Sequence, residues 1–243
     1  MRALLLLIVV FGTTKAFCQK EGNIWYFGHN VGLDFNHNPP IVLNNSKMFT
    51  GASCSTISDK NGMLLFYTDG VTVWNKNHQC MENGTGLFGH KYSTQSALIV
   101  KQPLNDSPNY IFTTDYNEGF IWPDTFNRGV NYSIVNIKLN NGLGKVVIKN
   151  INILKSSTQK IAAIRHRNGK DVWIITPQFF TTNIYSYLLT AEGINFTPVI
   201  SITKNKEIMG SGGCLKGSPD GDYLVKVNTG SYYDIFKFDN STG

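Results

Sequence analysis

The chain has 243 residues, of which 42% are hydrophobic and 16% charged, and its formal net charge is +6. This charge is mild and the basic residues are scattered, which argues against a nucleic-acid-binding surface. The chain is rich in Asn, Gly, Thr and aromatic residues and poor in Glu and Ala. This composition favours strands and turns over helices, so it predicts an all-β protein.

Residues 1–18 read as a signal peptide. A positive start at Met1-Arg2 precedes an apolar run from Ala3 to Phe11, which is too short to span a bilayer because a span needs about 20 residues. Cleavage after Ala16 or after Cys18 fits the pattern, and we prefer Cys18. The segment predicts export, and no later apolar run is long enough to cross a membrane.

Residues 19–243 form one predicted domain built from a repeated unit. Each unit has an apolar lead-in, a polar turn that ends in glycine, and a strand rich in aromatic and β-branched residues. The turn glycines Gly62, Gly169 and Gly221 are separated by about fifty residues or about twice that, and residues 105–109 fill the gap as a degenerate copy. This period predicts a β-propeller of four-stranded blades. We expect an incomplete arc of about four blades, truncated at the C-terminus.

Several strands can be assigned along the chain. Asn23–Phe27 is the first, and Met63–Thr68 and Val71–Trp74 flank an Asp-Gly pair typical of a hairpin turn. Residues 75–89 are mostly polar and are predicted as a loop. Tyr132–Leu139 alternates and is predicted as a half-buried strand, followed by an Asn-Asn-Gly turn at 140–142.

The cysteines and histidines carry little functional signal. Cys54 and Cys80 are the candidate disulfide pair because both lie in the first unit, and a pair of buried free thiols fits the sequence equally well. No Cys or His spacing matches a metal site, so we expect no metal and no cofactor.

Catalytic patterns are weak. His90 lies near Ser93 and Ser96, but the chain has no Gly-x-Ser-x-Gly elbow, so we read these residues as structural. Some propellers are glycosidases, which need two carboxylates at a defined separation. Among the aspartates, Asp69 is explained by its hairpin turn, and Asp115 is the one candidate worth testing.

Aromatic residues in or beside loops are the remaining functional signal. Tyr116, Trp122, Tyr232 and Tyr233, together with Asp115, are the candidate ligand-binding residues. Aromatic faces bind sugars and protein partners well, so a surface glycan or a protein is the expected ligand. Packing between blades remains an alternative role for the same side chains.

Three stretches resemble a known family. They are Glu21–Gly28 with Gly32–Phe35, Ile57–Asn77, and Gly89-His90 with Ser93–Val100. The chain resembles the N-terminal part of secreted Bacteroidetes propeller proteins that carry a gliding-motility-associated C-terminal domain. The resemblance implies export by the type IX secretion system and a cell-surface or released protein whose propeller precedes adhesive modules and a sorting domain.

Together these observations predict a non-catalytic, exported binding or scaffold propeller, secreted or at the cell surface, with a role in adhesion or gliding. The alternative is a carbohydrate-active enzyme that uses carboxylates in the propeller channel. Neither prediction includes a cofactor, a nucleic-acid partner or a membrane span.

Overall fold

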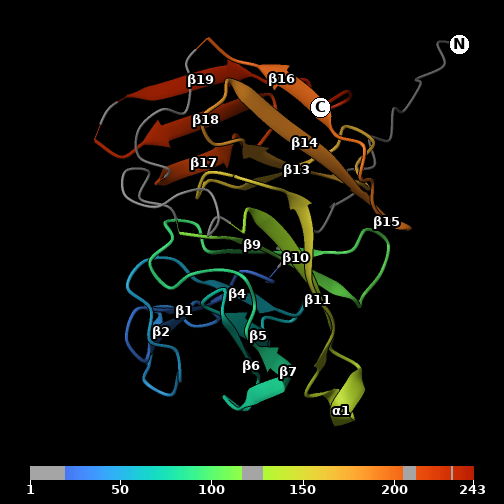
Figure 1. Cartoon of the computed structure of the whole chain (residues 1–243). Helices are drawn as coiled ribbons and strands as arrows, with labels where there is room; N and C mark the ends of the chain where they lie inside the picture. The colour runs from blue at the N-terminus through green and yellow to red at the C-terminus, as the bar shows by residue number, and fades with distance from the viewer. Residues whose placement is uncertain (1–19, 117–127, 205–211, 231) are drawn as a thin grey trace, which may run out of the picture.

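A computed structural model describes residues 20–116, 128–204, 212–230 and 232–243 (Figure 1). The predicted signal peptide at 1–18 and the candidate Trp122 lie outside these residues. The described chain contains nineteen strands and a single short helical turn, which confirms the all-β class predicted from composition.

The strands form four sheets, and most of them pair with their neighbours in the chain. The first sheet contains β1 (Ile24–Phe27), β2 (Val31–Asp34) and β3 (Ile41–Leu43). The second sheet has eight strands in the spatial order β4-β5-β6-β7-β11-β10-β9-β8. Their bounds are β4 (Ser55–Ser58), β5 (Leu64–Thr68), β6 (Thr72–Asn75), β7 (Cys80–Thr85), β8 (Ala97–Lys101), β9 (Asn109–Thr114), β10 (Val130–Asn136) and β11 (Lys145–Leu154).

The third and fourth sheets complete the fold. The third contains β12 (Ala162–Arg165), β13 (Val172–Pro177), β14 (Asn183–Thr190), β15 (Gly193–Ile194) and β16 (Val199–Ile202). The fourth contains β17 (Gly213–Gly217), β18 (Tyr223–Asn228) and β19 (Tyr233–Lys237). Figure 1 shows these two sheets above the eight-stranded sheet.

The eight-stranded sheet consists of two antiparallel four-stranded runs joined edge to edge. Strands β7 and β11 pair in parallel through one bridge, Glu82 opposite Lys145, whose side chains also form an ion pair at 2.7 Å. The end strands β4 and β8 contact each other, so the sheet is nearly closed. Because this bridge merges two runs and the other sheets have three or five strands, the pairing does not show the separate four-stranded blades expected from sequence.

Residues 75–89, predicted as a loop, contain strand β7. Its sequence Cys-Met-Glu-Asn-Gly-Thr is mostly exposed and buries the side chain of Met81. The strand lies at the outer edge of its four-stranded run, where backbone pairing with β6 stabilises it without an apolar pattern. The loop prediction was wrong for this reason.

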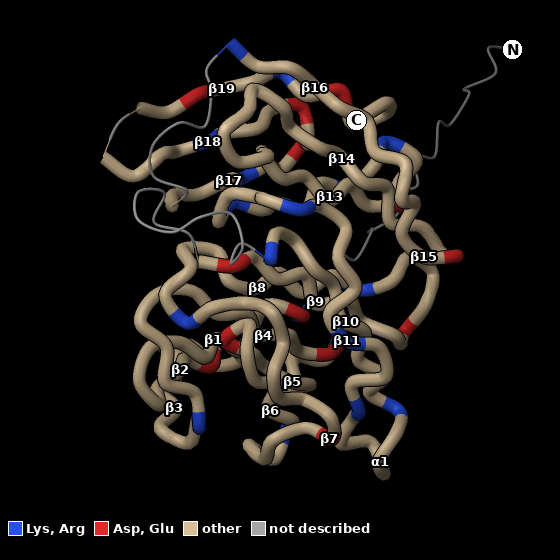
Figure 2. Tube along the Cα trace, viewed as in Figure 1, with Lys and Arg blue, Asp and Glu red and all other residues tan. Residues whose placement is uncertain are grey.

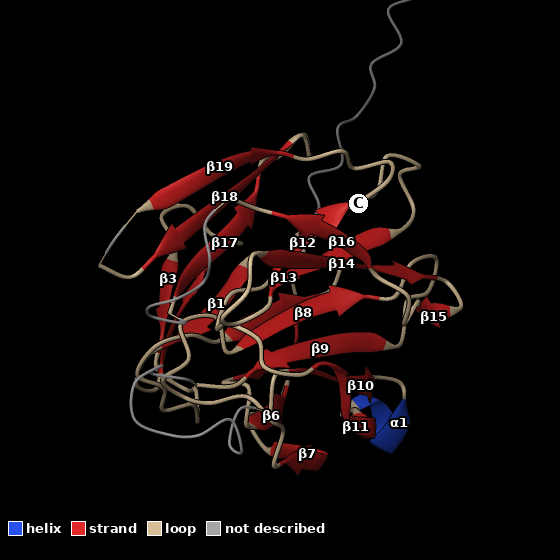
Figure 3. Cartoon of the chain, turned by 45° about the horizontal axis from the view of Figure 1, so that its top comes forward, coloured by secondary structure: helices blue, strands red, loops and turns tan. Residues whose placement is uncertain are grey.

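The strand predicted over Tyr132–Leu139 is shifted and more buried than expected. Strand β10 ends at Asn136, and its residues from Val130 to Val135 are all buried, because hydrophobic clusters cover both of its faces. The short helix α1 (Leu139–Gly142) follows (Figure 3). Within it Asn140 and Asn141 have φ values of 50° and 54°, so the segment is the turn that the Asn-Asn-Gly sequence predicted.

Each hydrophobic cluster fills the space between two sheets or runs that are consecutive in the chain. Tyr26 packs with Tyr67 between the first sheet and β4–β7, and Phe66 packs with Ile111 between β4–β7 and β8–β11. The next two clusters lie between β8–β11 and the third sheet, and between the third and fourth sheets. The apolar core is therefore divided into layers along the stack.

Charged residues are dispersed over the fold. Figure 2 shows Lys and Arg interspersed with Asp and Glu along the described part of the trace. Lys226 differs from most charged residues of the fold, because its side chain is almost fully buried. It forms a 3.0 Å ion pair with Asp234 and lies 5.6 Å from the ring centre of Phe236, which compensates for the burial of its charge.

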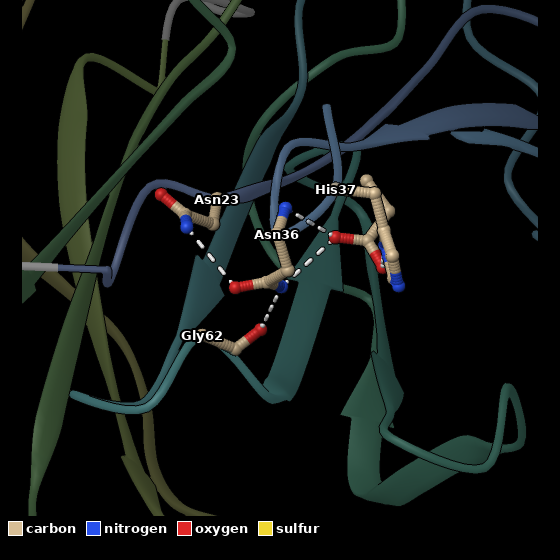
Figure 4. A network of polar contacts seen from close by, with 5 residues as sticks. Asn23, Asn36, His37 and Gly62 are labelled. Carbon is tan, nitrogen blue, oxygen red and sulfur yellow. Dashed lines mark hydrogen bonds and ion pairs between the residues drawn. The ribbon is translucent and has the colours of Figure 1, made fainter. Parts of the chain in front are cut away.

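An asparagine network attaches the first sheet to the β4–β5 turn (Figure 4). Asn36 donates through its backbone N–H and through Nδ2 to Oδ1 of Asp34, both at 2.8 Å, and Nδ2 also donates to the Gly62 carbonyl at 2.9 Å. Its Oδ1 accepts from Asn23 at 3.0 Å, while His37 pairs with Asp34 at 3.3 Å. These groups bond to one another and hold the residues after β2 against the β4–β5 turn, so we assign the network a structural role.

Cys54 and Cys80 are free thiols, so the candidate disulfide is not formed. Cys54 immediately precedes β4, while Cys80 lies in β7, three strands away in the same sheet. Three strand spacings amount to about 14 Å, well beyond the reach of a disulfide. The alternative of buried thiols holds only in part, because Cys80 is exposed while Cys54 is half-buried, and burial raises the pKa of the Cys54 thiol to about 11.

The layered core predicts different costs for the same substitution at two isoleucines. Ile174 in β13 is fully buried, whereas Ile202 in β16 is 79% exposed. We expect Ile174→Ala to lower the free energy of unfolding by about 2–5 kcal/mol. We expect Ile202→Ala to change it by less than about 0.5 kcal/mol. Chemical denaturation of both variants measures this, and equal effects would contradict the assignment of the core.

Candidate functional site

Loops from three sheets converge where β8, β12 and β17 begin. Gln95 accepts hydrogen bonds at Oε1 from the backbone N–H groups of Ile161 (3.2 Å) and Leu215 (2.7 Å). Its Nε2 donates to the carbonyl of Leu215 at 3.3 Å. Ile161 immediately precedes β12 and Leu215 lies in β17. One side chain just before β8 therefore ties the starts of three strands together.

Thr94 extends this junction. Its backbone N–H donates to Oε1 of Gln159 at 2.8 Å, and its hydroxyl accepts from the backbone N–H of Gly213 at 3.0 Å. Thr94 thus contacts the segment before β12 and the first residue of β17. We call this side of the sheets the Gln95 end, meaning the loops before β8, β12 and β17 and the loops that emerge beside them.

The topology determines which other loops lie at the Gln95 end. Strands β9, β13 and β18 run antiparallel to β8, β12 and β17, so each finishes where its partner starts. The β5–β6 turn joins the same end, because Oγ of Ser96 donates to the Asp69 carbonyl at 2.7 Å. Segments far apart in the sequence therefore share one surface.

The described site candidates lie at this end. Asp115 and Tyr116 directly follow β9, whereas Tyr232 and Tyr233 lie where β19 begins, in the fourth sheet. The structure brings Asp115 and Tyr116 into one group with His90, while the two C-terminal tyrosines belong to a different sheet of the stack. Tyr233 is 69% exposed.

Three rings form the centre of this group. The rings of His90 and Tyr116 stack with centroids 5.0 Å apart and an interplanar angle of 22°. The Tyr92 ring lies 5.7 Å from His90 and 6.5 Å from Tyr116, and its side chain is half exposed. With Asp115 we call these residues the His90 cluster. It presents an aromatic surface next to a carboxylate.

Asp115 is held by backbone donors and lies near the positive charge of Arg128. Its Oδ1 accepts from the N–H of Tyr116 at 2.8 Å, and its Oδ2 accepts from the N–H of Arg128 at 3.1 Å. Burial disfavours the carboxylate and raises the pKa of Asp115, while the backbone donor and charge of Arg128 and the charge of His90 oppose that rise. The net shift of the pKa is upward, so burial dominates.

A hollow lined by asparagines lies beside Asp115. The guanidinium of Arg128 covers the ring of Phe88 at 4.5 Å, and Nδ2 of Asn152 donates to the Arg128 carbonyl at 2.8 Å. The volume is about 480 Å³, and the lining residues are Phe88, Arg128, Asn131, Asn150, Asn152, Lys155 and Ser156. Arg128 therefore connects this hollow to the His90 cluster.

The serines near His90 are used structurally. Oγ of Ser93 shares a 2.9 Å hydrogen bond with Thr114, and Oγ of Ser96 accepts from the backbone N–H of His90 at 3.1 Å. The ring nitrogen Nδ1 of His90 accepts from the N–H of Tyr92 at 3.3 Å. Among the described contacts, none joins a serine hydroxyl to the imidazole, as a serine nucleophile requires.

No protein-family model matches this chain, and no curated protein matches it. Within the described residues, no three His, Cys, Asp or Glu side chains are grouped as a metal site. None of the helices in that part of the chain has the length and hydrophobicity that crossing a membrane requires.

Sequence reasoning missed several residues of this end. Gln95 lies in the stretch Ser93–Val100, which carries the family resemblance but gives no role for its side chain, and Tyr92 and Arg128 have no local signal. These residues matter because they contact residues that are distant in the sequence. The spacing of apolar residues along a strand gives no information about such contacts. The ring of His90 was considered for catalysis, whereas the structure uses it to stack on Tyr116.

Gln95 provides a direct test of the junction. Removing its amide in Gln95→Ala leaves the N–H groups of Ile161 and Leu215 without their acceptor. We expect the free energy of unfolding to fall by about 1–3 kcal/mol. The control is Gln79→Ala, at an exposed position, with an expected change below about 0.5 kcal/mol. Denaturant unfolding measures both, and a neutral Gln95→Ala would contradict the role of the junction.

The pKa values of the Asp115 and Asp220 carboxyl groups should be shifted in opposite directions from the ordinary value for aspartate. Burial raises the pKa of Asp115, whereas the Ser218 hydroxyl lowers the pKa of Asp220. Because the folded-state pKa of Asp115 exceeds its unfolded value, its contribution to stability is complete below the unfolded value and is lost as pH rises through the folded value. Carboxyl-carbon NMR across acid pH measures both midpoints. An Asp115 midpoint at or below that of Asp220 would refute the assignment.

Proposed function

We propose that this protein is a non-catalytic, exported binding module whose ligand contacts the Gln95 end. The observation that carries the proposal is the convergence of loops from successive sheets on one surface, where the exposed Tyr92 stands next to Asp115 and Tyr116. Tyrosine offers a large rigid contact area with a polar tip, which suits recognition of sugars and proteins.

We further propose that the four-stranded runs and sheets are blades of a β-propeller arc. The first strands β4, β8, β12 and β17 contact one another in chain order, as they would around a central axis. The clusters between consecutive layers are those expected between neighbouring blades. Loops that converge at one end of such an arc are the usual place for a ligand.

The proposed ligand is a surface glycan, with a protein surface as the second possibility. Aromatic rings next to hydrogen-bonding side chains suit sugar rings, and the His90 cluster combines both. The N-terminal pattern of residues 1–18 supports export. The family resemblance supports a role in adhesion or gliding at the cell surface.

A carbohydrate-active enzyme is the rival function, and one observation favours it. Burial raises the pKa of Asp115, which is the direction of shift that a general acid requires. Against it, both carboxylate oxygens of Asp115 already accept backbone hydrogen bonds, and the positive charge of Arg128 opposes the rise of its pKa. A glycosidase needs a second carboxylate within about 10 Å. The binding function therefore has the stronger support.

A glycan array probed with the secreted protein tests the proposal. We expect a glycan ligand whose affinity falls at least about tenfold in Tyr92→Ala and in Tyr116→Ala. The matched control is Tyr223→Ala, since Tyr223 starts β18 at the opposite end of the sheets and is similarly exposed.

Activity assays on polysaccharides separate the two functions. The binding module shows no turnover, either in the unchanged protein or in Asp115→Asn. Turnover that is lost in Asp115→Asn would establish the enzyme instead. A protein ligand with no glycan bound would change the partner but keep the site.

A further inference from the structure

A second hollow lies at the opposite end of the sheets, where β4, β8 and β12 finish. Its volume is about 740 Å³, within the range of small-molecule sites. Ile57, Ile99 and Ala163 line it from these three strands. The charged residues around it are Glu21, Lys101, Asp106, Arg165 and Lys170. We call it the Arg165 cavity.

The position of this cavity follows from the strand directions. Lys101 is the last residue of β8 and Arg165 is the last residue of β12. Both strands start at the Gln95 end, so their final residues lie at the other side of the molecule. The Arg165 cavity is therefore distinct from the His90 cluster, and the two can be tested separately.

The basic groups of the cavity are only partly neutralised. Lys101 lies 3.8 Å from Oε1 of Glu21, which is a long ion pair. The exposed Arg165 and Lys170 form no side-chain hydrogen bond or ion pair within the described part of the chain. Arg165 and Lys170 thus line the cavity without a direct ion pair in the described chain, and an arginine guanidinium presents a planar fork that matches a carboxylate.

Buried polar atoms adjoin the same wall. The backbone N–H of Ser58 donates to the Glu21 carbonyl, and Asn109 is the ladder partner of Lys101. Oε2 of Glu21, Oγ of Ser58 and both amide atoms of Asn109 are buried without a hydrogen-bond partner. Buried polar groups ordinarily find a partner, often an ordered water. Of these groups only Glu21 lines the cavity itself, whose wall combines charged side chains with the apolar Ile57 and Ile99.

We propose that the Arg165 cavity binds a small organic anion with at least two carboxylates. Arg165 holds one carboxylate through paired N–H donors, and Lys170 and Lys101 attract the second. The volume accommodates such a molecule together with several waters. The acidic residues Glu21 and Asp106 reduce the net positive charge of the cavity. We therefore expect an anion that contacts Arg165, Lys170 and Lys101 together to bind more tightly than an anion that contacts only one of them.

Calorimetric titration of the secreted protein with citrate at low ionic strength tests the proposal. We expect saturable binding that weakens at least about tenfold in Arg165→Gln. The matched control is Arg167→Gln, which removes the same charge at a position two residues further along the chain. The side chain of Arg167 lines a different hollow, together with Asp222 and Asp239. The control is expected to bind citrate within about twofold of the unchanged protein.

Other ligands define the chemistry of the site. Maltose, a neutral sugar of suitable size, should not bind, and inorganic phosphate should bind at least about tenfold more weakly than citrate. No citrate binding, or equal losses in Arg165→Gln and Arg167→Gln, would overturn the proposal. Phosphate binding as tight as that of citrate would overturn the assignment to carboxylates. A circular dichroism spectrum identical to that of the unchanged protein excludes misfolding of either variant, since both arginines are exposed.

Discussion

Burial of apolar side chains between consecutive sheets is the constraint on which the rest of this structure depends. A three- or four-stranded sheet has two faces and too little interior of its own, so each layer must cover the next. Here the rings of Tyr67 and Phe66 point to opposite sides of one strand and enter different clusters. Every interior sheet is thus held by two interfaces, and the order of the sheets follows the order of the chain.

Because the apolar core lies between the sheets, polar side chains can occupy the ends of the strands and form hydrogen bonds there. At the Gln95 end, one amide satisfies backbone groups before β12 and in β17, which fixes loops that apolar packing alone would leave independent. The His90 cluster depends on that fixed geometry, because His90 and Tyr116 come from the loops before β8 and after β9. This surface is therefore preorganised, a property that would lower the entropy lost on binding the proposed ligand.

The Gln95 end and the end with the Arg165 cavity differ in the environment of their charged groups. At the Gln95 end, burial raises the pKa of Asp115 against the opposing influence of Arg128 and His90. At the other end, Arg165 and Lys170 remain exposed and form no ion pair within the described chain. A desolvated carboxylate beside aromatic rings suits sugars, whereas exposed cations around a hollow suit anions. The same stack of sheets therefore supports two chemically distinct proposals.

The sequence by itself determined the all-β class, the Asp69-Gly70 hairpin and the turn at 140–142, because turn chemistry and composition are local properties. It misjudged β7, whose stability comes from backbone pairing at a sheet edge, and the burial of β10, which is covered on both faces. Only the tertiary structure decided that β7 pairs with β11 and that Gln95 joins three strands. Such contacts depend on how separate layers meet in space, and a residue's neighbours in the chain carry no record of that.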